Sequence, residues 1–301
     1  MDNVTLSYII TTRNKLPYLK KAMIRLLENI KEGEEIIIAD GASADGTKDF
    51  LKELHKQKKI HCFVSEPDIG ESHALNKLFF RARGDLVRII TDDDAFYYPG
   101  IQECKKFMLE HPEIDMLGTN GGFKNQLLKD EIRPLNYQNN YRQWQKDRIP
   151  FSSCGLGLMI RKSSLPILGL WNPSFRKADA EFMLRVTSGP ANIAWHNAPT
   201  FVNISNPQSV SAVYMKKIKD ETDRLNKFYF NKSPDSFLVQ KLKIIRNKIR
   251  SEILHREPSS KEKHSQEEFR DRWLKMFAAS EKWLEIKNKE KKPEFLWNTR
   301  K

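Results

Sequence analysis

Three consecutive aspartates, Asp92, Asp93 and Asp94, are the strongest indication of chemistry in the sequence. They follow the apolar run of residues 86–90, which predicts a buried strand. Adjacent carboxylates repel one another, so such a cluster requires solvent, a helix N-terminus or a cation beside it. A hard divalent cation, Mn²⁺ or Mg²⁺, binds carboxylate and phosphate oxygens and could neutralise a departing diphosphate. The alternative interpretation is a solvated turn that caps the helix expected after Pro99.

Polar segments also follow the other predicted strands of the first hundred residues. Apolar runs at residues 4–11, 35–39 and 60–64 predict these strands, and helical periodicity follows each of them. Strands that alternate with helices pair in parallel, and ligands then bind beyond the carboxyl ends of the strands. We therefore expect four loops to converge on one edge of the sheet, namely residues 11–14, 40–46, 65–72 and 92–94.

The pattern changes in the second half of the chain. Helices are predicted at residues 100–111 and 178–187, and strands at residues 114–117, 156–160, 193–196 and 200–204. Beyond residue 214 the sequence is polar and almost wholly helical. The sequence thus predicts an α/β catalytic domain in residues 1–214, with a mostly parallel sheet flanked by helices, and a basic, mainly helical region in residues 215–301.

The net charge of +13 is concentrated in the C-terminal region. Residues 215–301 contain 24 Lys and Arg against 14 Asp and Glu, whereas residues 1–214 contain 28 against 25. The expected ligand-binding edge is acidic and would repel a phosphodiester backbone, so we expect no nucleic-acid partner.

The lack of a recognisable targeting pattern and the arrangement of the cysteines favour a cytoplasmic location. No run approaches the roughly 18 apolar residues of a membrane span, and no cleavage pattern follows the short apolar run at the N-terminus. The three cysteines, Cys62, Cys104 and Cys154, are scattered without metal-ligand spacing, which fits a reducing compartment.

The order of the motifs resembles the family 2 glycosyltransferases, enzymes of the GT-A fold, which is a Rossmann-like fold. Their strand that ends in a Thr-x-Asn-like turn is similar to SYIITTRN, and their Asp-Gly-Ser-x-Asp-Gly-Thr loop is similar to DGASADGT, with one extra residue. Their next block resembles EPDIGESHALNK and ARGD, and their Asp-x-Asp motif resembles the triple aspartate followed by YPG. The resemblance covers residues 4–205 and implies an inverting, metal-dependent transferase that uses a nucleotide sugar.

The resemblance also implies which residues bind the donor. Thr11, Thr12 and Asp40 would line the nucleoside pocket, where the Asp40 carboxylate would accept a hydrogen bond from the base. Asp68 and Ser72 would approach the ribose or diphosphate at a helix N-terminus, which favours anions. The structural alternatives are that Asp40 shapes its loop as an Asx-turn and that Ser72 is an ordinary helix-start residue.

Within the triple aspartate, the resemblance implies that Asp94 is a direct metal ligand. Asp92 would contact the ribose or sugar or bind the metal through water, and Asp93 is expected beside the nucleotide sugar. Many relatives carry another acid immediately after this motif, where this chain has Ala95. That departure leaves the division of roles among the three aspartates open.

A second segment, GLWNPSFRKADAEFMLR, resembles the family segment in which an aspartate opens a helix near the acceptor. An inverting transferase needs a base that takes the proton of the acceptor hydroxyl as its oxygen attacks. Asp179 is expected to be that base, with Glu181 as the second choice; the alternative is that Asp179 only caps its helix. His196 follows an apolar run and is expected to be a packed side chain, although metal ligation is the other interpretation.

The resemblance implies a donor and an acceptor. The donor would be a nucleotide-diphosphate sugar, most simply a UDP-sugar, and the acceptor a hydroxyl of a glycan or lipid-linked molecule in surface polysaccharide or glycoconjugate synthesis. A metal-dependent nucleotidyltransferase also uses paired aspartates, but it usually has a glycine-rich phosphate loop where this chain has TTRNK. A non-catalytic nucleotide- or nucleic-acid-binding α/β protein is the remaining alternative.

Two amphipathic segments, residues 237–254 and 267–286, stand out in the C-terminal region. Lys and Arg surround the apolar stripe of the first segment, which fits peripheral contact with the anionic inner face of a membrane. We favour the alternative that this stripe packs on the catalytic domain or on a second copy of the chain, because amphipathic helices usually face a core.

Overall fold

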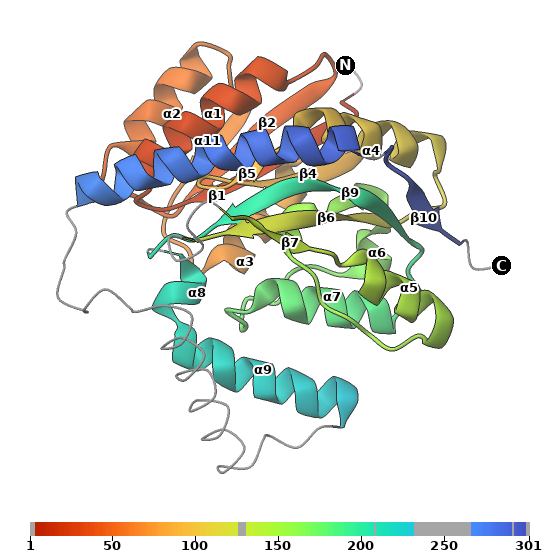
Figure 1. The fold of residues 1–301 in the computed structure, drawn as a ribbon. Coiled ribbons are helices and arrows are strands. Elements are labelled where there is room, and N and C mark those ends of the chain that lie inside the picture. The colour runs from red at the N-terminus through yellow and green to blue at the C-terminus, as the bar shows by residue number, and fades with distance from the viewer. Residues whose placement is uncertain (1–3, 126–130, 208, 232–265, 291, 299–301) are drawn as a thin grey trace.

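The computed structural model describes residues 4–125, 131–207, 209–231, 266–290 and 292–298. Figure 1 shows one central sheet with helices on both faces, which confirms the predicted α/β class. The first half of the chain alternates strands and helices as predicted. These elements are β1 (Leu6–Thr12), α1 (Leu16–Asn29), β2 (Glu34–Asp40), α2 (Thr47–Lys56), β3 (Cys62–Ser65), α3 (Glu71–Arg81) and β4 (Leu86–Thr91).

The first four strands pair in parallel. β1 lies between β2 and β4, with Thr12 opposite Asp40 and Thr11 opposite Thr91, and β2 pairs with β3. Because parallel strands end at the same edge, the four polar loops predicted to converge do follow strands that end together. This edge is called the loop edge below.

Antiparallel pairings enter in the second half and make the sheet mixed, whereas the sequence predicted a mostly parallel sheet. The elements there are β5 (Ala95–Phe96), α4 (Tyr98–Glu110), β6 (Met116–Lys124), β7 (Arg133–Leu135), α5 (Gln138–Asp147), β8 (Met159–Arg161), α6 (Leu165–Leu168), α7 (Ala178–Ser188) and β9 (Ile193–Ile204). They are followed by α8 (Val210–Val213), α9 (Met215–Phe230), α11 (Gln266–Glu290) and β10 (Phe295–Trp297). The strand order is β10-β9-β6-β8-β4-β1-β2-β3, with β5 paired to β9 and β7 paired to β6.

The prediction of two strands at residues 193–196 and 200–204 was wrong. β9 is one strand that pairs in parallel with β6, and its register shifts where Asn120 lies opposite Pro199. Proline has no N–H for the ladder, so a single strand with an irregularity resembles two short strands in the sequence pattern. The strand predicted at 156–160 is shorter, because Gly155–Gly157 form a 3-10 turn before β8.

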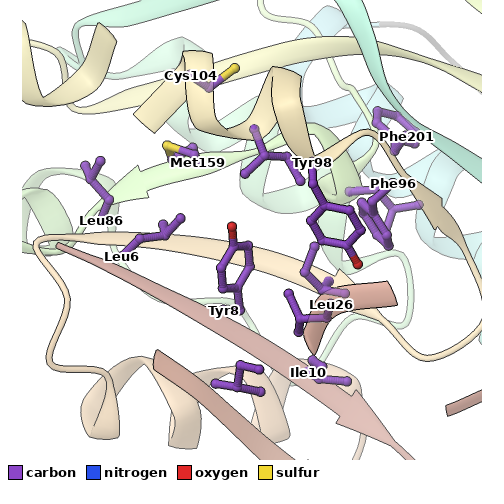
Figure 2. Packing of buried hydrophobic residues seen from close by; sticks show 14 of the residues in the cluster. Leu6, Tyr8, Ile10, Leu26, Leu86, Phe96, Tyr98, Cys104, Met159 and Phe201 are labelled. Atoms are coloured by element: carbon purple, nitrogen blue, oxygen red, sulfur yellow. The ribbon is translucent and has the colours of Figure 1, made fainter. Parts of the chain in front are cut away.

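The two faces of the sheet carry separate apolar clusters, as the period of a strand requires. Leu6, Tyr8 and Ile10 of β1 face α1, α2 and α4, whereas Ile9 faces the other side, where α3, α5 and α7 pack. Figure 2 shows the first cluster, in which Tyr98 of α4 lies among strand and helix side chains. Burial on both faces holds the loop edge in place.

α11 and β10 bring the end of the chain back to the sheet. Trp273, Met276, Phe277 and Leu284 of α11 are buried against Tyr18 and residues of β5 and β9, and β10 pairs antiparallel with β9. In Figure 1 the helix crosses the face of the sheet on which α1 also lies. The helical segment predicted at residues 267–286 is therefore confirmed, and it packs on the sheet.

The other predictions for the C-terminal region have different outcomes. Residues 237–254 lie outside the described part of the chain, and the division at residue 215 stays a prediction. Among the described residues, no helix has both the length and the apolar character needed to cross a membrane.

Candidate active site at the loop edge

The triple aspartate is buried at the end of β4 and contains a counter-charge that the sequence analysis missed. Asp92, Asp93 and Asp94 are 3%, 6% and 3% exposed. The Lys15 ammonium, at the start of α1, lies 3.2 Å from Asp92 Oδ1 and 2.7 Å from Asp93 Oδ2. Lys15 stands in the TTRNK turn directly after β1, at the same edge of the sheet as the aspartates after β4. Its place in the sequence could therefore have indicated this contact.

Asp94 ties residues 92–94, called the acidic loop below, to β9. Its oxygens accept hydrogen bonds from Thr91 Oγ1 at 2.6 Å, from the Ile204 amide at 2.6 Å and from Asn203 Nδ2 at 3.2 Å. Burial and repulsion from Asp93 nevertheless raise the pKa of the Asp94 carboxyl well above its usual range. Asp94, which the sequence predicted to bind the metal, is thus fixed in place by these hydrogen bonds. The groups around it only partly balance the negative charge of its carboxylate.

Asp93 is held from three directions. Its carboxylate accepts hydrogen bonds from Lys15 and, at 2.8 Å, from Asn206 Nδ2 after β9. Its backbone carbonyl accepts a 3.0 Å hydrogen bond from the indole of Trp273, which is fully buried in α11. A helix 180 residues away in the sequence therefore fixes the backbone of the acidic loop.

Asp40 shapes the loop after β2. Its carboxylate accepts hydrogen bonds from the Ser43 amide and hydroxyl, at 3.1 and 2.5 Å, and from Ser65 Oγ at 2.7 Å. These are the contacts expected if Asp40 shapes its loop as an Asx-turn, which was the alternative to binding the nucleoside. Asp68 lies beside the same loop, because a Cβ on Gly41 would meet Asp68 Oδ2 at 2.8 Å. The loops after β2 and β3 are therefore in contact.

The remaining residues predicted to bind the nucleoside lie on β1. Thr12 is buried and lies opposite Asp40, whose neighbour Gly41 donates its amide to the Thr12 carbonyl at 2.9 Å. Thr11, the preceding residue, is partly exposed. The structure thus brings Thr12, Asp40 and Asp68 together as predicted, while their contact with a nucleoside stays a prediction.

The start of α3 lies near the acidic loop, because the Glu71 carboxyl interacts electrostatically with Asp92 and Asp93. Ser72 is 3% exposed, and its hydroxyl has no hydrogen-bond partner among the described residues. Glu71 is an exposed residue, but desolvation of its carboxyl by the surrounding protein, together with repulsion from Asp179, raises the pKa of that carboxyl to about 7, with smaller contributions from Asp92 and Asp93. Because Glu71 interacts electrostatically with both, Asp179 and the acidic loop border the same region.

Asp179 does not cap its helix. It is the second residue of α7, after the N-cap position of Lys177, and its Oδ2 accepts a 2.8 Å hydrogen bond from the Gly155 amide. A Cβ on Gly155 would meet Asp179 Oδ1 at 2.6 Å, so only glycine allows this approach. Burial raises the pKa of the Asp179 carboxyl, which makes it a better proton acceptor.

The second choice for the base has a structural partner. Glu181 is 6% exposed and its Oε1 lies 2.9 Å from Arg185 Nε on the same helix. A carboxylate that is buried in an ion pair is less available to a substrate hydroxyl than Asp179.

His196 lies away from the acidic loop. It is fully buried in the first half of β9, where its ring packs 4.8 Å from that of Phe295 and its Nε2 is 3.5 Å from Glu103. Ile204, which contacts Asp94, is eight residues further along the same strand, a span of roughly 26 Å. The packed interpretation of His196 is therefore the one that the structure supports.

The charges of the acidic loop test whether a divalent cation fits. Within the described residues there is no group of three or more His, Cys, Asp or Glu side chains already arranged around one point as metal ligands. However, one ammonium faces three buried carboxylates, and burial keeps the pKa values of Asp92 and Asp94 raised despite Lys15. When all three carboxylates are ionised, they exceed the one ammonium by two negative charges, so oxygen donors and charge both suit a divalent cation.

The acidic loop after a central parallel strand and the candidate base Asp179 on α7 are the features that the resemblance to GT-A transferases predicted. The model of the family described as "Glycosyl transferase family 2" matches residues 7–165. The chain belongs to glycosyl transferase family 2.

Two curated relatives match part of the chain. The putative teichuronic acid biosynthesis glycosyltransferase TuaG of Bacillus subtilis is 30% identical over 105 residues, which are 35% of this chain and 42% of TuaG. The uncharacterized glycosyltransferase MJ1057 of Methanocaldococcus jannaschii is 27% identical over 120 residues, 39% of this chain and 41% of that protein. The matches thus span about two fifths of the length of these relatives.

Solved structures support the fold. The structure of S. aureus TarS 1–349 in complex with UDP-GlcNAc matches this chain with a TM-score of 0.56 at 15% sequence identity. The match covers 94% of this chain and 83% of the TarS chain. The mannosyltransferase PcManGT from Pyrobaculum calidifontis, in complex with GDP-Man and Mn²⁺, has a TM-score of 0.51 at 16% identity, with 73% of this chain and 64% of that chain covered. At these identities the likeness shows the fold alone.

Proposed function

We propose that this chain is an inverting glycosyltransferase that moves a sugar from a nucleotide-diphosphate sugar, in the first instance a UDP-sugar, to a hydroxyl of a glycan or lipid-linked acceptor. The observation that carries the proposal is that the Glu71 carboxyl interacts electrostatically both with Asp179, which the Gly155 amide orients, and with Asp92 and Asp93 of the acidic loop. Family membership and the UDP-GlcNAc complex of the structurally similar TarS support the donor class.

The donor side of the site would use the residues at the ends of β1 to β4. Thr11, Thr12 and Asp40 would surround the nucleoside, and the start of α3 with Asp68 and Ser72 would face the ribose and diphosphate. A helix N-terminus with free amide groups and an unpartnered buried hydroxyl suits phosphate oxygens. These roles rest on the family resemblance and on the contacts that bring the loops together.

A divalent cation, Mn²⁺ or Mg²⁺, would be held by Asp94 and Asp92, with Asp93 beside the nucleotide sugar. When bound, the cation would neutralise charge on the departing diphosphate. Lys15 would give up its longer, 3.2 Å contact with Asp92 and keep its 2.7 Å contact with Asp93. The protein would contribute the fixed position of Asp94, which Thr91 and the Ile204 amide hold.

The acceptor side would use Asp179. The attacking hydroxyl would transfer its proton to the Asp179 carboxylate, whose orientation the Gly155 amide sets. Because burial raises the pKa of this carboxyl, it binds the proton more strongly than an exposed aspartate would. The carboxylate then releases the proton to solvent after the product leaves.

A nucleotide panel tests this function. UDP-, GDP-, dTDP- and CMP-sugars would be added with and without Mn²⁺, with binding measured by thermal shift and release of the nucleoside diphosphate measured in the presence of candidate acceptors. We expect Mn²⁺-dependent stabilisation by at least one nucleoside-diphosphate sugar. Absence of stabilisation by every sugar nucleotide at saturating Mn²⁺ would remove the proposal.

The location of the activity is a separate proposal. Synthesis of surface polysaccharide on a lipid-linked acceptor would place the chain in the cytoplasm, peripherally on the inner face of the membrane. Co-sedimentation with anionic vesicles at low salt checks this proposal, and recovery of all protein in the supernatant would count against it.

A further inference from the structure

The helix α9 lies against α7, the helix that carries the candidate base Asp179. Leu225 of α9 packs with Ala180 and Leu184 of α7 in one apolar cluster, and Figure 1 shows α9 on the side of α7 that faces away from the sheet. The other side of α7 packs on the sheet. A helix from the region beyond residue 214 thus covers the outer side of the helix with the candidate base.

A buried carboxylate of α9 holds the backbone at the start of α7. Glu221 is 2% exposed, and its carboxylate accepts hydrogen bonds from the Arg176 amide at 2.9 Å and from the Lys177 amide at 2.8 Å. Amides at the start of a helix have no partner within the helix, so another segment has to supply one. Lys177 Nζ also donates to Thr222 Oγ1 of α9 at 2.8 Å. These contacts fix the point at which the chain enters α7.

Asp179 is therefore held from two directions. The Gly155 amide binds its carboxylate at 2.8 Å, and Glu221 binds the backbone amide of Lys177, two residues before it. The Lys177 carbonyl accepts the Glu181 amide at 3.2 Å, which closes the first turn of α7 around Asp179. A base has to lie within hydrogen-bond distance of the proton that it takes, and a misplacement of about 1 Å can lower a rate by about 10²-fold.

The Arg176 side chain extends the contact from α9 to the start of α3. Its Nη1 donates to the Ile69 carbonyl at 2.8 Å. A Cβ on Gly70 would collide with Nη1, so the guanidinium lies directly against the backbone that opens α3. The Gly70 carbonyl accepts amides of the first turn of α3 at 3.0 and 3.2 Å, and Ser72 lies in that turn. The segment that Glu221 holds thus contacts the element expected to face the diphosphate.

We propose that Glu221 is a positioning residue for Asp179, and that the Arg176 side chain extends the same effect to the start of α3. The proposal rests on the proposed function, in which Asp179 is the base and α3 faces the donor. Glu221 acts through the backbone of residues 176 and 177. Through them α9 sets the placement of the acceptor side and the donor side of one site.

The variants separate the two branches of this contact. Glu221→Ala removes the acceptor of both amides, whereas Glu221→Gln keeps an amide oxygen that can accept them. Arg176→Met removes the guanidinium and keeps the backbone amide that Glu221 binds. Glu221→Asp, which draws the carboxylate back by one methylene, replaces Glu221→Ala if that variant fails to fold.

Asp115→Asn is the matched control for loss of a buried carboxylate. Asp115 is 8% exposed and accepts hydrogen bonds from the Asn192 amide at 2.7 Å and from Ser164 Oγ at 2.6 Å. It precedes β6, at the end of the sheet opposite the loop edge. Its replacement should lower stability without changing the site.

Turnover is measured with the sugar nucleotide that binds most tightly in the panel above, at a temperature at which every variant is folded. We expect Glu221→Ala to lower kcat by about 10- to 100-fold, Glu221→Asp by about threefold, and Glu221→Gln to stay within about threefold of the wild type. Calorimetry should show that Arg176→Met weakens binding of the nucleoside diphosphate by about threefold while kcat stays within about twofold. Asp115→Asn should keep the wild-type kcat and nucleotide affinity.

Hydrogen exchange of the full chain decides the link without turnover. Glu221→Ala, or Glu221→Asp in its place, should speed exchange at residues 178–182 of α7 and, through Arg176, at residues 71–75 of α3, whereas Glu221→Gln should resemble the wild type. Failure of the proposed function looks different, because the wild type then turns over no sugar nucleotide while this exchange pattern is still present.

Three results would overturn the proposal. One is that Glu221→Ala keeps kcat within about twofold of the wild type. Another is that Glu221→Gln or Asp115→Asn loses as much kcat as Glu221→Ala, since the loss then does not depend on the two amide contacts. The third is that the faster exchange in Glu221→Ala is confined to α9.

Discussion

Lys15 Nζ lies 2.7 Å from Asp93 Oδ2 and joins the start of α1 to the acidic loop after β4. The contact is largely shielded from water, since the two side chains are 14% and 8% exposed. A buried carboxylate cluster thus contains its own cation. A divalent metal that binds there would have to share the carboxylates with Lys15.

Replacing Lys15 by methionine should destabilise the metal-free protein and tighten Mn²⁺ binding. The change leaves three buried carboxylates without a cation, which costs about 3 kcal/mol, and a metal then recovers more of that energy. Thermal unfolding across a Mn²⁺ titration measures both effects. Lys52→Met is the matched control, because Lys52 pairs with Asp49 on the surface at 57% and 82% exposure. Equal Mn²⁺ affinity in Lys15→Met and the wild type would contradict the shared-site account.

Replacing Asp179 by asparagine should lower sugar transfer by about 10²- to 10⁴-fold and leave nucleotide binding unchanged. The amide oxygen can still accept the Gly155 hydrogen bond, so the fold is kept while the base is lost. Transfer rates and UDP-sugar affinity separate the two properties. In Glu181→Gln, which loses the ion pair with Arg185, we expect lower stability with substantial transfer. A near-normal rate for Asp179→Asn would exclude it as the base.

Removing the indole N–H of Trp273 should loosen the acidic loop. Trp273→Phe keeps the ring in the apolar cluster but leaves the buried Asp93 carbonyl without its 3.0 Å donor, at a cost of about 1–3 kcal/mol. We expect lower thermal stability together with weaker Mn²⁺ binding. Trp297→Phe, a change at a 38% exposed position on β10, is the comparison. If Trp273→Phe loses stability without any loss of Mn²⁺ affinity, the helix supports the fold and not the site.

Glu35 should make the fold sensitive to acid. Burial would raise the pKa of this carboxyl, but hydrogen bonds from Ser7 Oγ and from the Arg83 amide and Nε, at 2.6, 2.6 and 2.8 Å, lower it below its usual value. The folded state therefore binds the proton less tightly than the unfolded state does. The stabilisation is complete above the ordinary glutamate pKa of about 4.3 and is lost as the pH falls through the lowered folded value.

Unfolding measured between pH 7 and pH 3 checks this prediction. Glu35→Gln should be less stable than the wild type at pH 7 by about 1.5–3 kcal/mol, and the difference should shrink as the pH falls. A difference that is independent of pH would show that the carboxylate charge contributes nothing.

Local periodicity accounts for the part of the fold that the sequence predicted. The parallel order of β1 to β4 and the convergence of their loops depend on strand and helix patterns within a few tens of residues, and these patterns are clear in the sequence. The continuity of β9 across Pro199 and the return of β10 to β9 depend on long-range pairing, which has no local signal.

The same distinction between local sequence signals and long-range contacts applies to the site. The aspartates stand out in the sequence because of their type and position, whereas their partners Lys15, Asn206 and Trp273 are ordinary residues in remote segments. Asp179 could be selected from its motif, but the contact with Gly155, which distinguishes a positioned carboxylate from a helix cap, required coordinates.

Anomalous diffraction from crystals soaked with Mn²⁺ and UDP locates the cation itself. We expect one manganese peak bound by Asp94 and Asp92 and by the diphosphate, with Lys15 withdrawn from Asp92. Nucleotide bound at the loop edge with no manganese peak, and with Lys15 still bridging Asp92 and Asp93, would contradict the proposed cation site.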